Sequence, residues 1–377
     1  MIYLDAAATT LQKPAAVRQA VLRAMDTCAN PGRSGHRPAM RAADIVYDCR
    51  QAAADFFHLD HPERVIFTQN ATHALNLAIK ALLHQGGHAV ISGYEHNSVV
   101  RPLEAMKAQG VSYTVARSPL FDREGAYNAI LEALREDTCC VILNHVSNVF
   151  GFQLPLEQVD ALCARRGIPL VVDASQSAGV LSLDVSRLTG AAFVCMPGHK
   201  GLYGPQGTGI LLCCKDREPY SLIQGGTGSF SLNLQQPADL PDALESGTLN
   251  VPGIAGLREG LRFVSTHRAE IRGREEALTR RLAEGLSALP GLSVWYSAAC
   301  QSGVLSFRAD DMDPGDLGQW LADRGICVRC GLHCAPLAHE SVGTLPEGTV
   351  RVSLSAFNTA PQTDRLVAAV AEAIKTA

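Results

Sequence analysis

Asp173 and Lys200 are the residues whose types and positions point most directly to chemistry. Asp173 follows the apolar run 170–172, so we expect it at the carboxyl end of a buried strand, where it faces a ligand or caps the next helix. Lys200 lies among glycines just after the apolar run 191–196. Partial desolvation there would lower the pKa of its amine and make it nucleophilic. A nucleophilic lysine with a carboxylate upstream matches the Schiff-base lysine and pyridinium partner that pyridoxal phosphate requires.

Two further segments supply the remaining parts of such a site. Small and polar residues at 70–73, among them Ala71 and Thr72, connect an apolar strand to a helical stretch. Free amide groups and the helix dipole at that point favour a phosphate, although an ordinary helix cap would explain the same residues. His96 follows the strand that ends at Ser92, at the same predicted sheet edge, where it could stack on an aromatic ring or have only a structural role.

These residues need a parallel sheet to bring them together. From about residue 64 to 214, short apolar segments alternate with segments of helical period. The predicted strands are 65–68, 88–92, 111–115, 140–143, 170–173 and 191–196, and the predicted helices include the stretch after residue 70 and the ranges 97–109, 126–136 and 156–166. This alternation indicates a mostly parallel sheet covered on both faces, with ligands at the carboxyl ends of its strands.

The rest of the chain predicts a smaller unit. Residues 218–253 are rich in glycine and proline and read as a loop-rich active-site segment. After them, the predicted helices are 254–267, 270–289, 314–324 and 361–375, and the predicted strands lie near 292–296, 303–308 and 350–354. We therefore expect a domain boundary near residue 255, with a large domain at 15–255 and a small α+β domain formed by 1–14 and 256–377.

Composition narrows the function classes. The chain has 377 residues, 47% apolar and 19% charged, which excludes disorder and suggests roughly two domains. The net charge of −4 and the lack of a basic run argue against a nucleic-acid partner. Neither a leader peptide nor an apolar run long enough for a membrane span is evident, so we expect a cytoplasmic protein. Twelve scattered cysteines, most of them in apolar runs, are expected to be reduced and buried.

Taken together, eight segments resemble the cysteine desulfurases and selenocysteine lyases, most closely their group II. These enzymes belong to the class V, fold type I branch of pyridoxal phosphate enzymes. The matching segments occur in order and with compatible spacing at 3–10, 94–97, 146–151, 173–177, 199–200, 245–250, 333–336 and 351–359. Each match is weak alone, but the set is specific and extends over nearly the whole chain.

The resemblance implies a fold, a reaction and partners. It implies an α/β fold in which a large domain holds a mostly parallel seven-stranded sheet and a smaller α+β domain lies at the C-terminus. Pyridoxal 5'-phosphate would be the cofactor, and L-cysteine or L-selenocysteine the substrate. L-Alanine would be released, and the sulfur would pass through a persulfide to an acceptor protein, for example in iron-sulfur cluster assembly. A homodimer is also implied.

The resemblance also assigns roles to individual residues. Lys200 would hold the cofactor and act as general base, His96 would stack on the ring, and Cys334 would accept the sulfur as a thiolate. The residues implied in cofactor binding are Ala71, Thr72, His96, Asn148, Asp173, Ser175, Gln176, Ser177, His199, Lys200 and Thr248, the last reaching the phosphate of the neighbouring subunit. Arg351 would clamp the substrate carboxylate, with Arg329 and Asn148 nearby.

Three positions depart from the family pattern. Ala6 replaces a common asparagine and Leu332 a frequent histidine, while Cys330 adds a second thiol four residues before Cys334. Cys330 would resolve a persulfide, form a disulfide with Cys334, or take no part, and we favour the last.

Three other readings stay open at this point. A selenocysteine lyase would depend less on the cysteine at 334, and a pyridoxal phosphate transaminase or racemase would need no sulfur acceptor. A metal or iron-sulfur module built from Cys327, Cys330, His333 and Cys334 lacks a second cysteine pair, so we expect no metal site.

Overall fold

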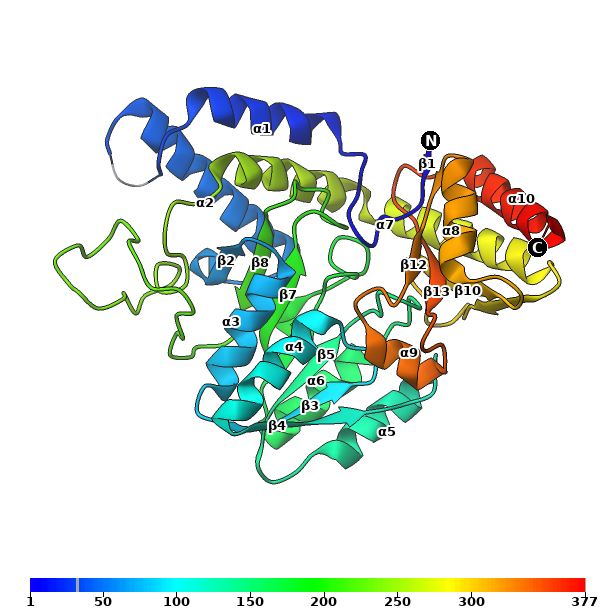
Figure 1. Cartoon of the computed structure of the whole chain (residues 1–377). Coiled ribbons are helices and arrows are strands. Elements are labelled where there is room, and N and C mark those ends of the chain that lie inside the picture. Colours follow the sequence, from blue (N-terminus) through cyan, green and yellow to red (C-terminus); the bar gives the residue numbers. More distant parts are fainter. Residues whose placement is uncertain (32–33, 377) are drawn as a thin grey trace.

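A seven-stranded sheet forms the centre of the larger part of the molecule (Figure 1). The computed structural model describes residues 1–31 and 34–376. In spatial order the strands are β2 (Val65–Thr68), β8 (Gly209–Cys213), β7 (Ala191–Pro197), β6 (Leu170–Asp173), β5 (Thr138–Asn144), β3 (Gly87–Ser92) and β4 (Val111–Ala116). Only β8 runs antiparallel to its neighbours. The carboxyl ends of β2, β7, β6, β5 and β3 therefore meet at one edge.

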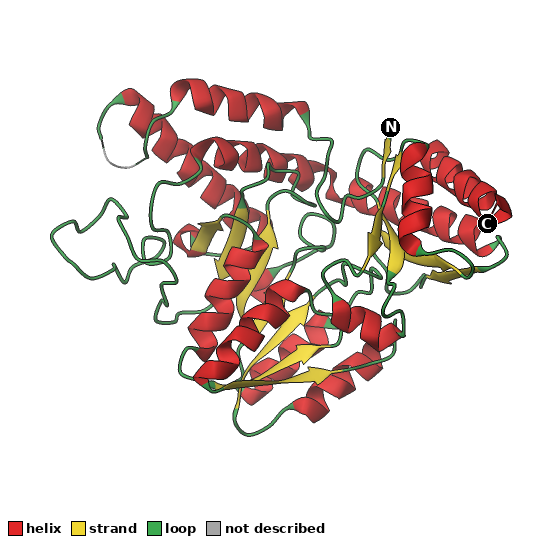
Figure 2. Cartoon of the chain, in the orientation of Figure 1, coloured by secondary structure: helices red, strands yellow, loops and turns green. Residues whose placement is uncertain are grey.

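Helices cover both faces of this sheet (Figure 2). Successive strand residues point to opposite faces, so Val141 belongs to one apolar cluster and Ile142 to the other. Helices α3 (Ala71–Leu83) and α4 (Asn97–Met106) pack on the face of Ile142, and helices α2 (Arg37–Phe57), α5 (Arg123–Ala133), α6 (Leu156–Arg166) and α7 (Val251–Ser287) contribute to the cluster on the other face. Because both faces are buried, the strands are nearly continuous apolar runs.

A second, antiparallel sheet lies beside the first and has its own apolar core. Its strands lie in the order β12 (Arg329–Gly331), β13 (Thr349–Ser353), β10 (Val304–Ala309) and β9 (Leu292–Trp295). The C-terminal part of α7 packs against this sheet together with α8 (Pro314–Asp323) and α10 (Ala360–Thr376), and the short helix α9 (Pro336–Val342) follows β12. The helix α7 thus contributes to both cores.

The N-terminal segment ties the two parts together. Strand β1 (Ile2–Tyr3) pairs in parallel with β11 (Ile326–Cys327). Downstream, the hydroxyl groups of Thr9 and Thr10 donate to the carbonyl oxygen of His199, beyond the carboxyl end of β7. Helix α1 (Ala15–Thr27) then packs along α7. The first ten residues therefore lie between the small sheet and the edge of the large one.

The segment between β8 and α7 contains neither a helix nor a strand. It is anchored near its end by Glu245, whose carboxylate accepts two hydrogen bonds at 2.9 and 2.8 Å from the guanidinium of Arg50 in α2. Both side chains are buried. The loop-rich character predicted for 218–253 is confirmed.

The predicted α/β fold with a mostly parallel sheet is confirmed, and two local predictions are wrong or incomplete. Residues 254–267 and 270–289 are not separate helices but parts of the continuous helix α7, because no proline or glycine interrupts the chain between them. The sequence pattern does not predict helices α1 and α2, which follow each other with no strand between them to set up an alternation. The predicted boundary near residue 255 falls within the first turns of α7 and stays a prediction.

Three short 3₁₀ helices, Pro62–Arg64, Lys107–Gln109 and Val185–Arg187, complete the elements. Within the described ranges, none of the helices is both long and apolar enough to cross a membrane.

Candidate active site

A pocket of about 210 Å³ lies where the edge of the large sheet meets the N-terminal segment and the small sheet. Most of the predicted site residues line it, from elements far apart in the sequence. Those residues are Ala71, Thr72, His96, Asn148, Asp173, Ser175, Gln176, His199, Lys200, Arg329 and Arg351, and they are joined by Asn70, Ser98, Asn144 and His333. The carboxyl-edge placement predicted from the strand pattern is therefore seen.

Lys200 and Asp173 reach the pocket from neighbouring strands. Asp173 is the last residue of β6, and its Oδ1 accepts a hydrogen bond of 2.9 Å from the amide of Ser175. Lys200 lies in the turn after β7. Burial lowers the pKa of Lys200 to about 8, an effect that the charge of Asp173 opposes. Burial also raises the pKa of Asp173, against hydrogen bonds from Ser175 and the charge of Lys200.

The first turns of α3 and α4 meet at another wall of the pocket. The Oδ1 of Asn70 caps α3 by accepting from the amide of His73 at 2.9 Å, so Ala71 and Thr72 form the first helical turn. His96 caps α4, and its Nδ1 accepts from the amide of Ser98 at 3.0 Å. The hydroxyl of Ser98 lies 2.8 Å from that of Thr72, which joins the two helix starts.

The ring of His96 is held neutral. Burial lowers the pKa of His96 to about 4, and the positive charge of Lys200 lowers it further. Because Nδ1 accepts a hydrogen bond, the neutral ring carries its proton on Nε2. A neutral imidazole can stack on an electron-poor ring without adding a second buried cation to the pocket.

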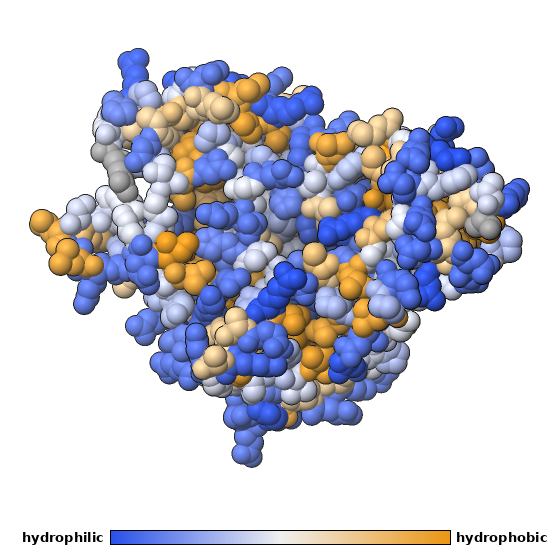
Figure 3. Space-filling view, viewed as in Figure 1, coloured by the Kyte–Doolittle hydropathy of each residue, from blue (hydrophilic) through white to orange (hydrophobic). Residues whose placement is uncertain are grey.

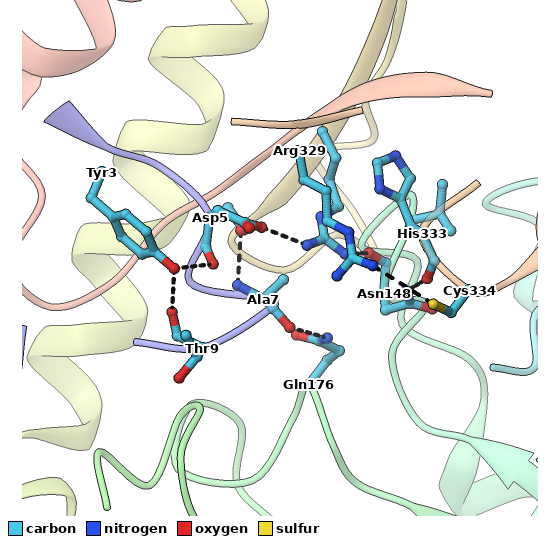
Figure 4. Close-up of polar contacts among 12 residues, drawn as sticks. Tyr3, Asp5, Ala7, Thr9, Asn148, Gln176, Arg329, His333 and Cys334 are labelled. Atoms are coloured by element: carbon cyan, nitrogen blue, oxygen red, sulfur yellow. Dashed lines mark hydrogen bonds and ion pairs between the residues drawn. The ribbon is translucent and has the colours of Figure 1, made fainter. Parts of the chain in front are cut away.

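Cys334 is not among the residues that line the pocket, but it follows the lining residue His333, on a strained turn. It is exposed, and Nη2 of Arg329 donates to its Sγ at 3.6 Å (Figure 4). His333 and Cys334 both have positive φ, 49° and 57°, in the left-handed region that non-glycine residues rarely adopt. Two hydrogen bonds hold this turn: the amide of Asn97 donates to the Cys334 carbonyl at 2.7 Å, and Nδ2 of Asn148 donates to that of His333 at 2.8 Å.

Arg351 is almost completely buried, with 1% of its surface exposed. Its Nη1 donates to the carbonyl oxygen of Asn148 at 2.9 Å, and its Nη2 to Oδ1 of Asp5 at 2.6 Å. Its Nε has no hydrogen-bond partner among the described residues. Burial lowers the pKa of Arg351, and the carboxylate of Asp5 opposes that effect.

Besides Cys334, two predicted residues, Ser177 and Thr248, do not line the pocket, whereas Gln176 does. Ser177 is fully buried and donates to the carbonyl oxygen of Ala174, so its hydroxyl does not line the pocket. Nε2 of Gln176 donates to the carbonyl oxygen of Ala7, which ties this pocket residue to the N-terminal segment. Thr248 lies outside the pocket and lines a separate cavity between the start of α3 and the 218–253 segment.

Comparison with known proteins establishes the family. The model of the family described as aminotransferase class-V matches residues 2–366. The chain belongs to the aminotransferase class V family. A probable cysteine desulfurase from Methanothermobacter thermautotrophicus is 32% identical over 96% of this chain and 92% of its own length. Another, from Pyrococcus abyssi, is 31% identical over 100% and 94%, respectively.

Solved structures agree with this class V assignment. The apo structure of a cysteine desulfurase from Thermococcus onnurineus NA1 matches with a TM-score of 0.90 and 29% identity, and covers 100% of this chain and 95% of that one. The cysteine desulfurase CsdA from Escherichia coli, in an S-sulfonic acid form, matches with a TM-score of 0.85 and 26% identity over 99% and 94%.

Cys330 faces away from the pocket because side chains alternate along strand β12. Alternate residues of β12 face opposite sides, so Arg329 faces the pocket while Cys330 packs against α8, where a Cβ at Gly318 would collide with its sulfur. Burial raises the pKa of Cys330 to about 11. These facts support the interpretation in which Cys330 takes no part. Within the ranges 1–31 and 34–376, no group of three or more histidine, cysteine or acidic side chains is placed to hold a metal ion.

Sequence reasoning gave no role to Asp5, Ser98 or Asn144. Ser98 had a usable signal, because it is two residues after His96 at a predicted helix start, where serine commonly makes local hydrogen bonds. Asn144 is paired with Asp173 across neighbouring strands, but its position in sequence does not reveal that. Asp5 contacts a residue 346 positions away, for which no local pattern exists.

Proposed function

We propose that this chain is a pyridoxal phosphate-dependent cysteine desulfurase, which converts L-cysteine to L-alanine and takes up the sulfur on Cys334. The observation that carries the proposal is the composition of one pocket. A lysine with a lowered pKa, a buried aspartate and a buried arginine line it, and an exposed cysteine contacts another arginine of its lining. The relatives named above support desulfurase over selenocysteine lyase, since all carry the former name.

The donor set fits pyridoxal phosphate. Lys200 would hold the aldehyde carbon, and Asp173 would pair with the ring nitrogen. The free amides at the start of α3 suit a phosphate, with the nearby Thr72, Ser175 and His199 side chains as further donors. His96 would stack on the ring. The buried Oδ1 of Asn148 and the Nδ1 of His333 have no hydrogen-bond partners among the described residues and would meet bound groups. When bound, the cofactor supplies an electron sink for negative charge at the substrate's α-carbon.

Individual residues of the chain would have separate roles in the reaction. Arg351 binds the substrate carboxylate through its fork of N–H donors. Lys200 is partly neutral near its pKa of about 8, so its amine can take the α-proton and later return a proton to carbon. Arg329 orients the Cys334 sulfur through the hydrogen bond between them.

The sulfur-transfer step joins the sulfur of Cys334 to the sulfur of the substrate. The Cys334 thiolate attacks the substrate sulfur, a sulfur-sulfur bond forms, and the carbon-sulfur bond breaks with its electron pair left on carbon. That carbon takes up a proton and leaves as L-alanine. The persulfide on exposed Cys334 is then accessible to an acceptor thiol, from a sulfur-acceptor protein in the cell or from an added reductant in the test tube.

Turnover of L-cysteine by the purified holoenzyme tests this proposal. With dithiothreitol present, the wild type is expected to release L-alanine and sulfide in equal amounts. Cys334→Ala is expected to lose sulfide release by on the order of a hundredfold, because no thiolate remains to accept sulfur, while the visible absorption of the cofactor is retained. Cys330→Ala is the matched control and should keep wild-type turnover. Undiminished turnover by Cys334→Ala would contradict the persulfide route.

We also propose that the enzyme is a homodimer. The segment between β8 and α7 protrudes from the body and carries apolar side chains at its tip, seen on the left of Figure 3. Leu232 and Leu234 are fully exposed and Phe230 is 64% exposed, which is costly for side chains of this size. Thr248 lies in the same segment, in a cavity of its own. If a partner subunit covers these leucines, this segment would lie beside the pocket of the partner subunit.

A cytoplasmic location is part of the proposal. All twelve cysteines are free thiols in the structure, and a persulfide carrier with this many thiols suits a reducing compartment.

A further inference from the structure

Asp5 is the only carboxylate among the described residues that forms an ion pair with Arg351. The contact is short, 2.6 Å between Nη2 and Oδ1, and Arg351 is 1% exposed while Asp5 is partly accessible. Arg351 lines the pocket, whereas Asp5 is not among the residues that line it, so the Asp5 carboxylate contacts the guanidinium from beside the pocket. It accepts from Nη2, one of the donors of the guanidinium fork.

The position of Asp5 is fixed by its backbone. Its main chain forms a parallel bridge with Ser353 of β13, two residues from Arg351. The hydroxyl of Tyr3 donates to the Asp5 carbonyl at 3.1 Å and to the Thr9 carbonyl at 2.8 Å, which closes the N-terminal turn. The amide of Ala7 donates to the Ser353 hydroxyl at 2.8 Å. These contacts anchor the Asp5 backbone beside β13, the strand that carries Arg351.

The negative charge of Asp5 affects both the stability of the ligand-free pocket and the binding of a ligand carboxylate. A buried cation without a counter-ion is strongly destabilised, so Asp5 stabilises the ligand-free pocket. When an amino acid binds, its carboxylate brings a second negative charge to the same guanidinium. Two like charges a few ångströms apart in a pocket with little water repel each other much more than they would in bulk water. Asp5 therefore opposes ligand binding while it stabilises the empty site.

We propose that Asp5 is the resting counter-ion of Arg351, which competes with the ligand carboxylate and so weakens the binding of substrate and product alike. This rests on the proposed function, in which Arg351 receives the carboxylate of cysteine. Weak binding of the product has a benefit, since L-alanine carries the same carboxylate and must leave after each turnover. Asp5 is then a residue of the N-terminal segment that favours product release.

The test compares ligand affinities in Asp5 variants. Asp5→Asn keeps the shape and an oxygen that accepts from Arg351 but removes the charge. Calorimetry on the holoenzyme is expected to give L-alanine a dissociation constant at least about fivefold lower than in wild type, because the ligand now supplies the only counter-charge. The KM for L-cysteine should fall with kcat no higher than wild type. Asp5→Ser carries the same expectation and replaces Asp5→Asn if the latter does not fold.

Two controls separate charge from structure. Asp5→Glu keeps the charge and should return the affinity for L-alanine toward wild type. Asp364→Asn removes the carboxylate of another 2.6 Å ion pair, the exposed one with Arg281, and should leave ligand affinity unchanged. If the uncharged Asp5 variants bind L-alanine no more tightly than wild type, Asp5 does not compete for Arg351 and the inference is overturned.

A readout without the cofactor keeps the two proposals distinguishable. Propionate carries a carboxylate but neither amine nor sulfur, and it should raise the melting temperature of cofactor-free Asp5→Asn at lower concentration than that of wild type. If the wild type releases no sulfide from L-cysteine but the propionate result holds, the proposed function fails and the counter-ion role stands. If the wild type releases sulfide but propionate and L-alanine bind wild type and Asp5→Asn equally, the proposed function stands and the counter-ion role fails.

Discussion

At the residue scale, burial in the pocket shifts the pKa of its reactive groups toward the neutral forms of Lys200 and His96. Lys200 is partly deprotonated because it is buried, and His96 is neutral for the same reason. Cys334 and His333 lie in left-handed backbone conformations that cost of order 1–3 kcal/mol each. Hydrogen bonds from Asn97 and Asn148 to this turn offset that cost. The thiol on this turn is exposed, so an acceptor can reach it.

The pKa of Lys200 gives a prediction for the cofactor-free protein. Only the neutral amine reacts with an acylating reagent, so labelling of Lys200 should rise with pH and approach a plateau above about 8. A lysine with the ordinary pKa of about 10.4 would still be accelerating there. Mass spectrometry of the peptide that carries Lys200, after short labelling pulses from pH 6 to 10, measures the profile. A rate that keeps rising steadily through pH 10 would contradict a lowered pKa.

At the element scale, α7 joins the two cores and carries a buried acid at the joint. Glu275 is 5% exposed, and its carboxylate packs so closely against Gly303, just before β10, that a Cβ there would lie 2.6 Å from Oε2. Burial raises the pKa of Glu275 to about 8, and nearby Glu276 raises it further. Glu275 also lines a cavity of about 30 Å³ together with Lys200 and Ser302, enough for a water molecule.

This raised pKa predicts how stability depends on pH. Between pH 4.5 and 8 the folded protein keeps on Glu275 a proton that the unfolded chain loses, so this contribution to stability is full below pH 4.5 and is lost as pH rises through 8. The contribution of Glu275 to the free energy of unfolding should therefore fall by about 2–4 kcal/mol from pH 5 to 8, at about 1.4 kcal/mol for each pKa unit.

Urea unfolding of Glu275→Gln at both pH values measures the effect, since the variant should lack this part of the decline. Glu276→Gln is the matched control, because that side chain is 41% exposed and pairs with Arg272 at the surface. Equal pH dependence in wild type and Glu275→Gln would show that the carboxyl group is ionised in the folded protein.

At the scale of the whole molecule, three separate regions contribute residues to the candidate active site. The large sheet provides Lys200 and Asp173, the small sheet provides Arg329 and Arg351, and the N-terminal segment closes the gap between them. The protruding apolar tip lies away from the small sheet, as Figure 1 shows. Covering that tip by a second subunit would remove the exposed leucines from water.

Dimerisation therefore should depend on that tip. The double variant Leu232→Glu/Leu234→Glu is expected to raise the dimer dissociation constant by about a hundredfold, since each buried leucine contributes about 1.5 kcal/mol. Light scattering coupled to gel filtration, over a dilution series, measures the mass. Leu345→Glu, at a 41% exposed leucine elsewhere on the surface, should stay as dimeric as the wild type. If the double variant has the same molecular mass as the wild type at all concentrations, the dimer interface lies elsewhere.

The strand and helix alternation of residues 64–214, the α/β class and the residues at the carboxyl ends of the strands can be predicted from the amino-acid sequence. These features follow from local periodicity, because strands with both faces buried are apolar and parallel strands are usually joined by helices. Asp173 and Lys200 are therefore identified from their neighbours in the chain. The pairing of Asp5 with Arg351, the packing of Cys330 against α8 and the continuity of α7 are seen in the folded chain alone. Such contacts join residues with no shared local pattern, and they form only when the two sheets and the N-terminal segment pack together.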